Sequence, residues 1–158
     1  MNAYILNIKN NDHVIIDCSD YDAFTKYCEE HKDIAYSLQM LDMSMNLMPE
    51  IPQAFAVTED VVVFTESAYE NEFIKQHELG HIHHGHVAAA LSQAGADAVM
   101  INDDWEIIAD AYAVEHSSRE LALVTLKSIK EQVKNNKHLP DVMKDTTIKQ
   151  LDLRIQAL

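Results

Sequence analysis

Four short runs of hydrophobic and β-branched residues lie in the first 65 positions of the chain, in two pairs. Residues 3–8 (AYILNI) and 13–17 (HVIID) flank one polar turn, and residues 54–58 (AFAVT) and 61–65 (VVVFT) flank another. Apolar runs of this length on either side of a short polar turn are typical of β-hairpins. The pattern therefore predicts two hairpins in the N-terminal part of the chain.

Between these two pairs the apolar positions recur at helical spacing. Ser19 is a suitable N-cap for a helix over about residues 20–31. A second helix, over about residues 34–48, places five apolar side chains on one stripe: Ile34, Leu38, Leu41, Met45 and Met48. We expect this stripe to pack in the core.

The rest of the chain is predicted to be helical. Ser67 and Glu70 have the spacing of a capping box, so a helix is expected from about Ala68 to His84, with Gly85 ending it. Further helices are expected over about residues 87–100, 103–118, 119–136 and 141–157. We therefore predict one α+β domain over residues 1–158, mostly helical, with short N-terminal β-hairpins.

Composition and charge narrow the classes of protein to consider. Hydrophobic residues make up 47% of the chain and charged residues 24%, as in an ordinary globular protein. The net charge of −14 opposes nucleic-acid binding, which requires clustered lysine and arginine. No run of about 18 apolar residues is present, so we expect neither nucleic acid nor membrane as a partner.

The cysteines and the first residues indicate a compartment. Cys18 and Cys28 are the two cysteines of the chain. One disulfide is conceivable, but two isolated thiols in a chain of this size fit a reducing compartment better. The first residues lack the basic region and the long apolar segment of a secretory signal. We expect a cytoplasmic protein.

Residues 77–81 read His-Glu-Leu-Gly-His, which is the HEXXH pattern. Two histidines four positions apart project from one face of a helix, where both imidazoles can bind one Zn²⁺. Glu78 would lie about 100° round the helix, beside the open coordination position. There it can act as general base towards a water molecule whose pKa the zinc ion lowers to about 7. The pattern predicts a hydrolytic site in which His77 and His81 hold one zinc ion per chain.

The histidines crowded around this motif allow other interpretations. His83, His84 and His86 follow closely, so the segment could be an exposed histidine-rich helix. His84 lies on the same helical face as His77 and His81 and could complete a three-histidine site. However, one straight helix cannot easily wrap three turns around a tetrahedral ion. We expect His83 and His86 to face solvent or to support the metal ligands.

A catalytic zinc ion needs a third protein ligand as well as an open position. Glu106 is the candidate, and Asp110 follows one helical turn later on the same face. Two carboxylates at this spacing repel each other unless positive charge lies nearby. Zinc on Glu106, with a zinc-bound imidazole held by Asp110, would supply that charge. The alternatives are a capping box formed by Asp103 and Glu106, and a solvated helix face for Asp110.

At these residues the chain resembles the gluzincin metallopeptidases, in particular the HtpX-like and ImmA/IrrE families. The HtpX-like pattern runs from Pro-Asn-Ala-Phe-Ala through a hydrophobic strand and HEXXH with a later histidine to Glu-x-x-Ala-Asp. The ImmA/IrrE-like pattern is HELGH-x-x-x-GH. The matching segments are residues 52–56 (PQAFA), 61–65 (VVVFT), 77–86 (HELGHIHHGH) and 106–110 (EIIAD). Gln53 replaces the asparagine, and Ala111 stands where an arginine often follows the aspartate.

The resemblance implies a zincin-like fold in which Glu106 is the third ligand and Asp110 supports a ligating histidine. It also implies that the strand before the active-site helix binds a peptide or protein substrate in extended form, along Ala54, Phe55, Ala56 and Val57. Gluzincins generally stabilise the tetrahedral intermediate with a tyrosine, histidine or arginine that follows the third ligand. The candidates here are Tyr112, His116 and Arg119.

These observations predict a zinc-dependent metalloendopeptidase with Glu78 as general base. The main rival is a catalytically silent zinc-binding regulatory or interaction protein on a peptidase fold. Such a protein would bind metal without turnover. A zinc hydrolase of small amides is a third class, and it would have a closed pocket in place of an open groove.

Overall fold

The computed structural model describes residues 1–92 and 103–158. The elements, in chain order, are β1 (Asn2–Asn7), β2 (Asp12–Asp17), α1 (Tyr21–Glu30), α2 (Lys32–Leu47), β3 (Ala54–Ala56), β4 (Val61–Thr65), α3 (Glu66–Tyr69), α4 (Glu72–His83), α5 (His86–Ser92), α6 (Asp103–His116), α7 (Arg119–Asn135) and α8 (Asp141–Ala157). The mostly helical α+β class predicted from the sequence is confirmed.

The described strands form one antiparallel sheet in the order β2-β1-β4-β3. Both predicted hairpins are present, as β1 with β2 and as β3 with β4. Strand β1 joins them by pairing with β4, so β3 lies at one edge of the sheet. Strand β3 ends at Ala56, which leaves Val57 and Thr58 beyond the strand, contrary to the predicted run.

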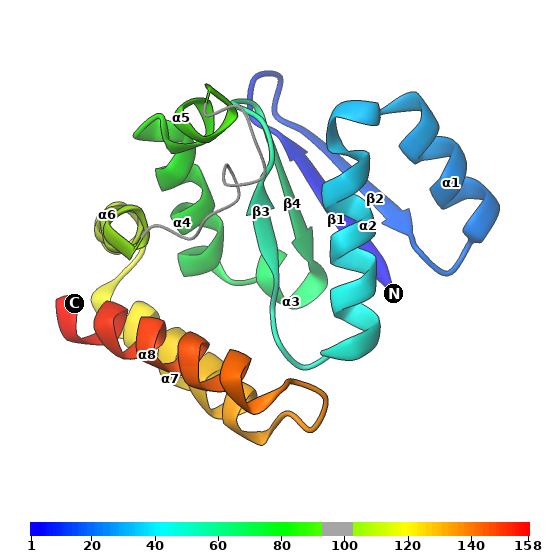
Figure 1. Ribbon diagram of the computed structural model, residues 1–158. Helices are drawn as coiled ribbons and strands as arrows, with labels where there is room; N and C mark the ends of the chain where they lie inside the picture. Colours follow the sequence, from blue (N-terminus) through cyan, green and yellow to red (C-terminus); the bar gives the residue numbers. More distant parts are fainter. Residues whose placement is uncertain (93–102) are drawn as a thin grey trace.

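Helices cover both faces of this sheet (Figure 1). Val63 of β4 packs with the α1–α2 pair, in a cluster that contains Leu38 and Leu41. Its neighbours Val62 and Phe64 point to the opposite face and pack with residues of α4, α6, α7 and α8. This alternation is what a strand buried on both faces requires. The predicted stripe of α2 is buried from Ile34 to Met45.

Two predicted helix starts are wrong. Asp20, and not Ser19, caps α1 by accepting a hydrogen bond from the backbone N–H of Ala23. The helix expected from Ala68 to His84 is interrupted after α3. Asn71 is extended there and caps α4 through the N–H of Ile74, while its side-chain amide donates to Thr125 of α7. This contact with a distant helix favours Asn71 as the cap over the local capping box at Ser67.

The remaining helix predictions agree with the structure where it describes the chain. Gly85 follows α4 with a φ of 72°, the left-handed conformation expected of a residue that ends a helix. Helices α6, α7 and α8 match their predicted ranges. The predicted helix over 87–100 is present as α5, and its later part with Gly95 lies outside the described residues. Within residues 1–92 and 103–158, no helix is both long and apolar enough to cross a membrane.

Candidate metal centre

Helix α6 packs closely on α4 at Gly80, the fourth residue of the HEXXH motif. A Cβ atom on Gly80 would lie 3.2 Å from both the Cα and the carbonyl oxygen of Ala109 and 3.1 Å from the Cβ of Tyr112. These distances are tighter than ordinary contacts, so a glycine here lets the two backbones approach. The approach brings the start of α6 over the two histidines of α4.

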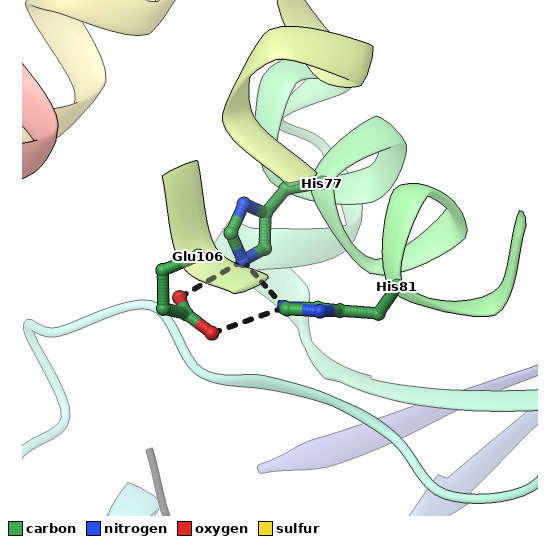
Figure 2. A group of neighbouring side chains, drawn as sticks. All are labelled: His77, His81 and Glu106. Carbon is green, nitrogen blue, oxygen red and sulfur yellow. Dashed lines mark hydrogen bonds and ion pairs between the residues drawn. The ribbon is translucent and has the colours of Figure 1, made fainter. Parts of the chain in front are cut away.

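His77, His81 and Glu106 converge at this crossing (Figure 2). The Nε2 atoms of the two histidines are 3.0 Å apart. The carboxylate oxygens of Glu106 lie 3.2 Å from His77 Nε2 and 3.1 Å from His81 Nε2. The carboxylate of Glu106 therefore reaches the histidines from a different helix.

The donor set fits a zinc ion. Zinc binds imidazole nitrogen and carboxylate oxygen at about 2.0–2.2 Å, which places two ligand atoms of a tetrahedral site about 3.3 Å apart. The two Nε2 atoms, 3.0 Å apart, are close to this value, and each has one oxygen of the Glu106 carboxylate within 3.2 Å. Two histidines and one carboxylate also leave the fourth position for water or substrate, as in catalytic zinc sites. These three residues could therefore hold one zinc ion.

Asp110 supports His77 from the side opposite the ligand atom. Its Oδ1 lies 2.8 Å from His77 Nδ1, so Nε2 is the ring nitrogen left for a metal. Arg154 of α8 donates two hydrogen bonds to the same carboxylate, from Nε (2.7 Å) and from Nη2 (2.8 Å). Its Nη1 lies 3.5 Å from Oε2 of Glu106. Arg154 thus supplies positive charge beside the two carboxylates of α6.

The charges in this network shift the pKa values of its members. Burial and the nearby Arg154 disfavour a charged His77, but hydrogen bonds to Asp110 and Glu106 outweigh them and raise its pKa to about 9. Burial alone would raise the pKa of Asp110, whereas Arg154 and His77 lower it. Without metal, His77 is therefore charged at neutral pH, with a proton on each ring nitrogen. Zinc would have to displace the proton on Nε2.

His81 has a different support. Its Nδ1 lies 3.0 Å from Nδ1 of His86, the first residue of α5. His86 is buried and stacks on Trp105 of α6, with ring centroids 4.8 Å apart and planes within 4°. Burial, followed by the neighbouring His81 and His84, lowers the pKa of His86 to about 4. His86 is therefore buried beside His81 and does not face solvent.

Glu78 is buried next to the ligands and faces the edge strand. Its Oε2 accepts a hydrogen bond of 2.9 Å from the backbone N–H of Ala56. Burial raises the pKa of Glu78, and the nearby His77 and His81 only partly offset this. For Glu106, hydrogen bonds to the same two histidines outweigh burial and lower the pKa. The two neighbouring carboxylates thus have pKa values shifted in opposite directions.

The edge strand β3 turns alternate backbone groups away from the sheet. Hydrogen bonds from Val57 N to Val61 O and from Thr65 N to Gln53 O, both 2.9 Å, fix which residues pair with β4. In an antiparallel ladder the intervening residues, Ala54 and Ala56, direct their N–H and C=O groups outward. The Ala56 N–H reaches Glu78, so this outer edge faces the candidate site.

A cavity of about 440 Å³ adjoins the site and is lined by both Ala54 and Phe55. The polar residues on its wall include His77, Glu78, His81, Glu106 and Arg154. Most of the other lining side chains are apolar, among them Phe73, Ile74, Leu126, Ile129, Val133 and Leu151. Helices α7 and α8 thus contribute an apolar wall opposite the edge strand.

The other predicted site residues lie elsewhere. Tyr112 and His116 stack on each other at 4.0 Å, next to the exposed His83 and His84, and none of these four residues lines the cavity. Tyr112 and His116, two of the residues predicted to stabilise the oxyanion, thus lie outside the cavity lining, and His84 is not part of the ligand group. Arg119 donates to the carbonyl oxygen of Leu158.

Comparisons of the chain with protein-family models, with curated proteins and with solved structures found no match. The resemblance to gluzincins therefore rests on the motif residues alone. Sequence reasoning missed Arg154, which stands three positions after Leu151, a buried residue of α8. An arginine one turn after a buried leucine on the same helix is a candidate for an acidic partner, and that was the available signal.

Proposed function

We propose that this protein is a zinc-dependent metalloendopeptidase with a zincin-like fold. One observation carries the proposal: two histidines and one carboxylate offer ligand atoms within 4.8 Å of one another, beside the buried Glu78, which lies outside this group. A structural zinc site is normally closed by four protein ligands. A set of three, next to a separate proton acceptor and a cavity, is the arrangement that hydrolysis requires.

The chain's own residues account for the proton transfers. When bound, zinc would polarise the scissile carbonyl and lower the pKa of the attacking water. Glu78 takes a proton from that water as the water oxygen bonds to the carbonyl carbon. The C–N bond then breaks, and Glu78 delivers the proton to the leaving nitrogen. Burial raises the pKa of Glu78, which makes its carboxylate a better proton acceptor than an exposed one.

The edge strand supports an extended peptide as substrate. Ala54 directs its N–H and C=O outward and Ala56 its C=O, while the Ala56 N–H is bonded to Glu78; a peptide that adds to a sheet edge pairs with such outward groups. A peptide paired there would run past the Glu78 carboxylate, which the Ala56 N–H holds at this edge. The apolar wall from α7 and α8 favours a large apolar side chain next to the cleaved bond.

Replacing Glu78 with glutamine tests the proposal. Glu78→Gln keeps the shape and a hydrogen-bond acceptor for the Ala56 N–H but cannot take a proton. We expect peptide hydrolysis to fall by about 10²–10⁴-fold. The assay is cleavage of a peptide library rich in leucine, phenylalanine and methionine, read by mass spectrometry, with zinc content measured in parallel.

The matched control is Glu72→Gln, which changes an exposed glutamate on the same helix. It should retain both zinc and activity. Cleavage by Glu78→Gln at the rate of the wild type would exclude Glu78 as the base. A wild type that binds zinc but cleaves no peptide of the library would favour the catalytically silent binding protein.

A further inference from the structure

The two histidines of the candidate zinc site are supported by different chemistry. A carboxylate, Asp110, faces Nδ1 of His77. A second imidazole, that of His86, faces Nδ1 of His81. An ionised carboxylate can accept a hydrogen bond through either oxygen. An imidazole can accept one only through the ring nitrogen that carries no proton. The support of His81 therefore depends on which nitrogen of His86 carries the proton.

Local backbone geometry brings His86 to this position. Gly85 ends α4 in the left-handed conformation, with a φ of 72°, so the chain turns back immediately after the HEXXH helix. Its carbonyl then accepts the N–H of Ala89 as α5 begins. On its other side His86 stacks on Trp105, one residue before Glu106. The ring is therefore held between His81 and the start of α6.

The tautomer of His81 follows from its surroundings. Its Nε2 lies 3.0 Å from His77 Nε2 and 3.1 Å from Glu106 Oε1, so it faces the other two candidate ligands. A neutral imidazole that binds metal through Nε2 carries its proton on Nδ1. The Nδ1 of His86, 3.0 Å away, is placed to accept that proton in a hydrogen bond. His86 must then carry its own proton on Nε2.

We propose that His86 is a positioning residue for His81: its Nδ1 accepts the Nδ1–H of His81 and so fixes Nε2 as the metal-binding atom. This inference rests on the proposed function, because it assumes that His81 binds zinc. His86 itself does not contact the metal. Its role parallels that of Asp110 on His77, and such partners orient the ring and tune the basicity of the ligand nitrogen.

Two substitutions separate hydrogen bonding from packing. His86→Leu removes the acceptor, whereas the side-chain oxygen of His86→Asn occupies nearly the position of Nδ1 and can still accept. Both lose the stacking on Trp105. We expect His86→Leu to weaken zinc binding by about 10–100-fold and His86→Asn to recover most of that loss. Zinc titrations of both variants, with melting curves of the metal-free proteins, give the comparison.

His83→Ala is the control, because this exposed histidine belongs to the same cluster and its ring contacts are with His84 and Tyr112. It should bind zinc like the wild type. Equal zinc affinity in His86→Leu and wild type, or an equal loss in His86→Asn and His86→Leu, would overturn the role of His86 alone. A wild type without zinc would overturn the metal site and this inference together.

Nitrogen NMR of the zinc-loaded wild type gives a readout that needs no substitution. Ring correlations distinguish the two neutral tautomers of each histidine. We expect His81 protonated at Nδ1 and His86 protonated at Nε2. A proton on Nδ1 of His86 would contradict the proposal, because the two Nδ1 atoms could then not share a hydrogen bond in the proposed direction.

Discussion

The two faces of the sheet bury very different side chains. On the side covered by α1 and α2, these two helices bury apolar side chains around Leu38 and Leu41, together with Cys28 and the hydroxyl of Ser44. The other side of the sheet carries α4 and α6 (Figure 1). The buried histidine and carboxylate side chains of the described residues are all found on α4, α5 and α6: His77, Glu78, His86 and Asp110.

This difference separates what the fold requires from what a site requires. Burying polar or charged groups costs free energy unless partners satisfy them, so an apolar cluster is the simpler way to build a core. The α1–α2 face shows that this chain can do so. On the other side every buried side-chain nitrogen and oxygen of the described residues has a hydrogen-bond partner. Such a concentration of partnered, pKa-shifted groups beside a cavity is typical of a functional site.

A substitution that opens a cavity on the α1–α2 side tests whether stability there and zinc binding on the other side are independent. Leu38 is fully buried in α2, so Leu38→Ala should reduce the free energy of unfolding by about 2–5 kcal/mol. Zinc affinity should stay the same, because Leu38 packs on the opposite face of the sheet. Denaturant unfolding and a zinc titration of the same variant test both statements.

Met43→Ala is the control for this loss, because Met43 is an exposed residue of the same helix. It should change stability little. If the folded Leu38→Ala variant lost zinc affinity as well as stability, the two faces would be coupled. That result would contradict the statement that they act independently.

Asp110→Asn tests the side of the sheet that carries the candidate metal site, and we expect a smaller change in free energy than for Leu38→Ala. Asparagine keeps the size of the side chain but removes the charge that faces His77 and Arg154. We expect zinc binding to weaken by about 10–100-fold, the range for residues that orient a ligand without touching the metal. Asp104→Asn, at an exposed position of the same helix, should bind zinc like the wild type. Unchanged affinity in Asp110→Asn would reduce Asp110 to a structural residue.

The parts of the fold and site that follow from local spacing were predictable. His77 and His81 are one turn apart on one helix, and Gly85 ends that helix where a glycine was expected. The hairpins followed from runs separated by polar turns. Each of these features depends on a few consecutive residues, so the sequence carries its full signal.

Features that depend on distant contacts could not be predicted in the same way. Asn71 interrupts the predicted helix through a bond to Thr125, and Arg154 reaches Asp110 across 44 positions of sequence. The spacing of Glu106 after the motif suggested a ligand, but only the packing of α6 at Gly80 shows the carboxylate against both histidines. The placement of Tyr112 away from the cavity follows from the same packing.

A zinc titration of the wild type and Glu106→Gln tests whether His77, His81 and Glu106 together hold a zinc ion. The wild type should bind about one zinc ion per chain. Glutamine brings no negative charge to the ion, so Glu106→Gln should bind at least about tenfold more weakly, or about 1.4 kcal/mol. Glu115→Gln, an exposed change on the same helix, should match the wild type. Wild-type affinity in Glu106→Gln, or a wild type that takes up no zinc, would contradict the account.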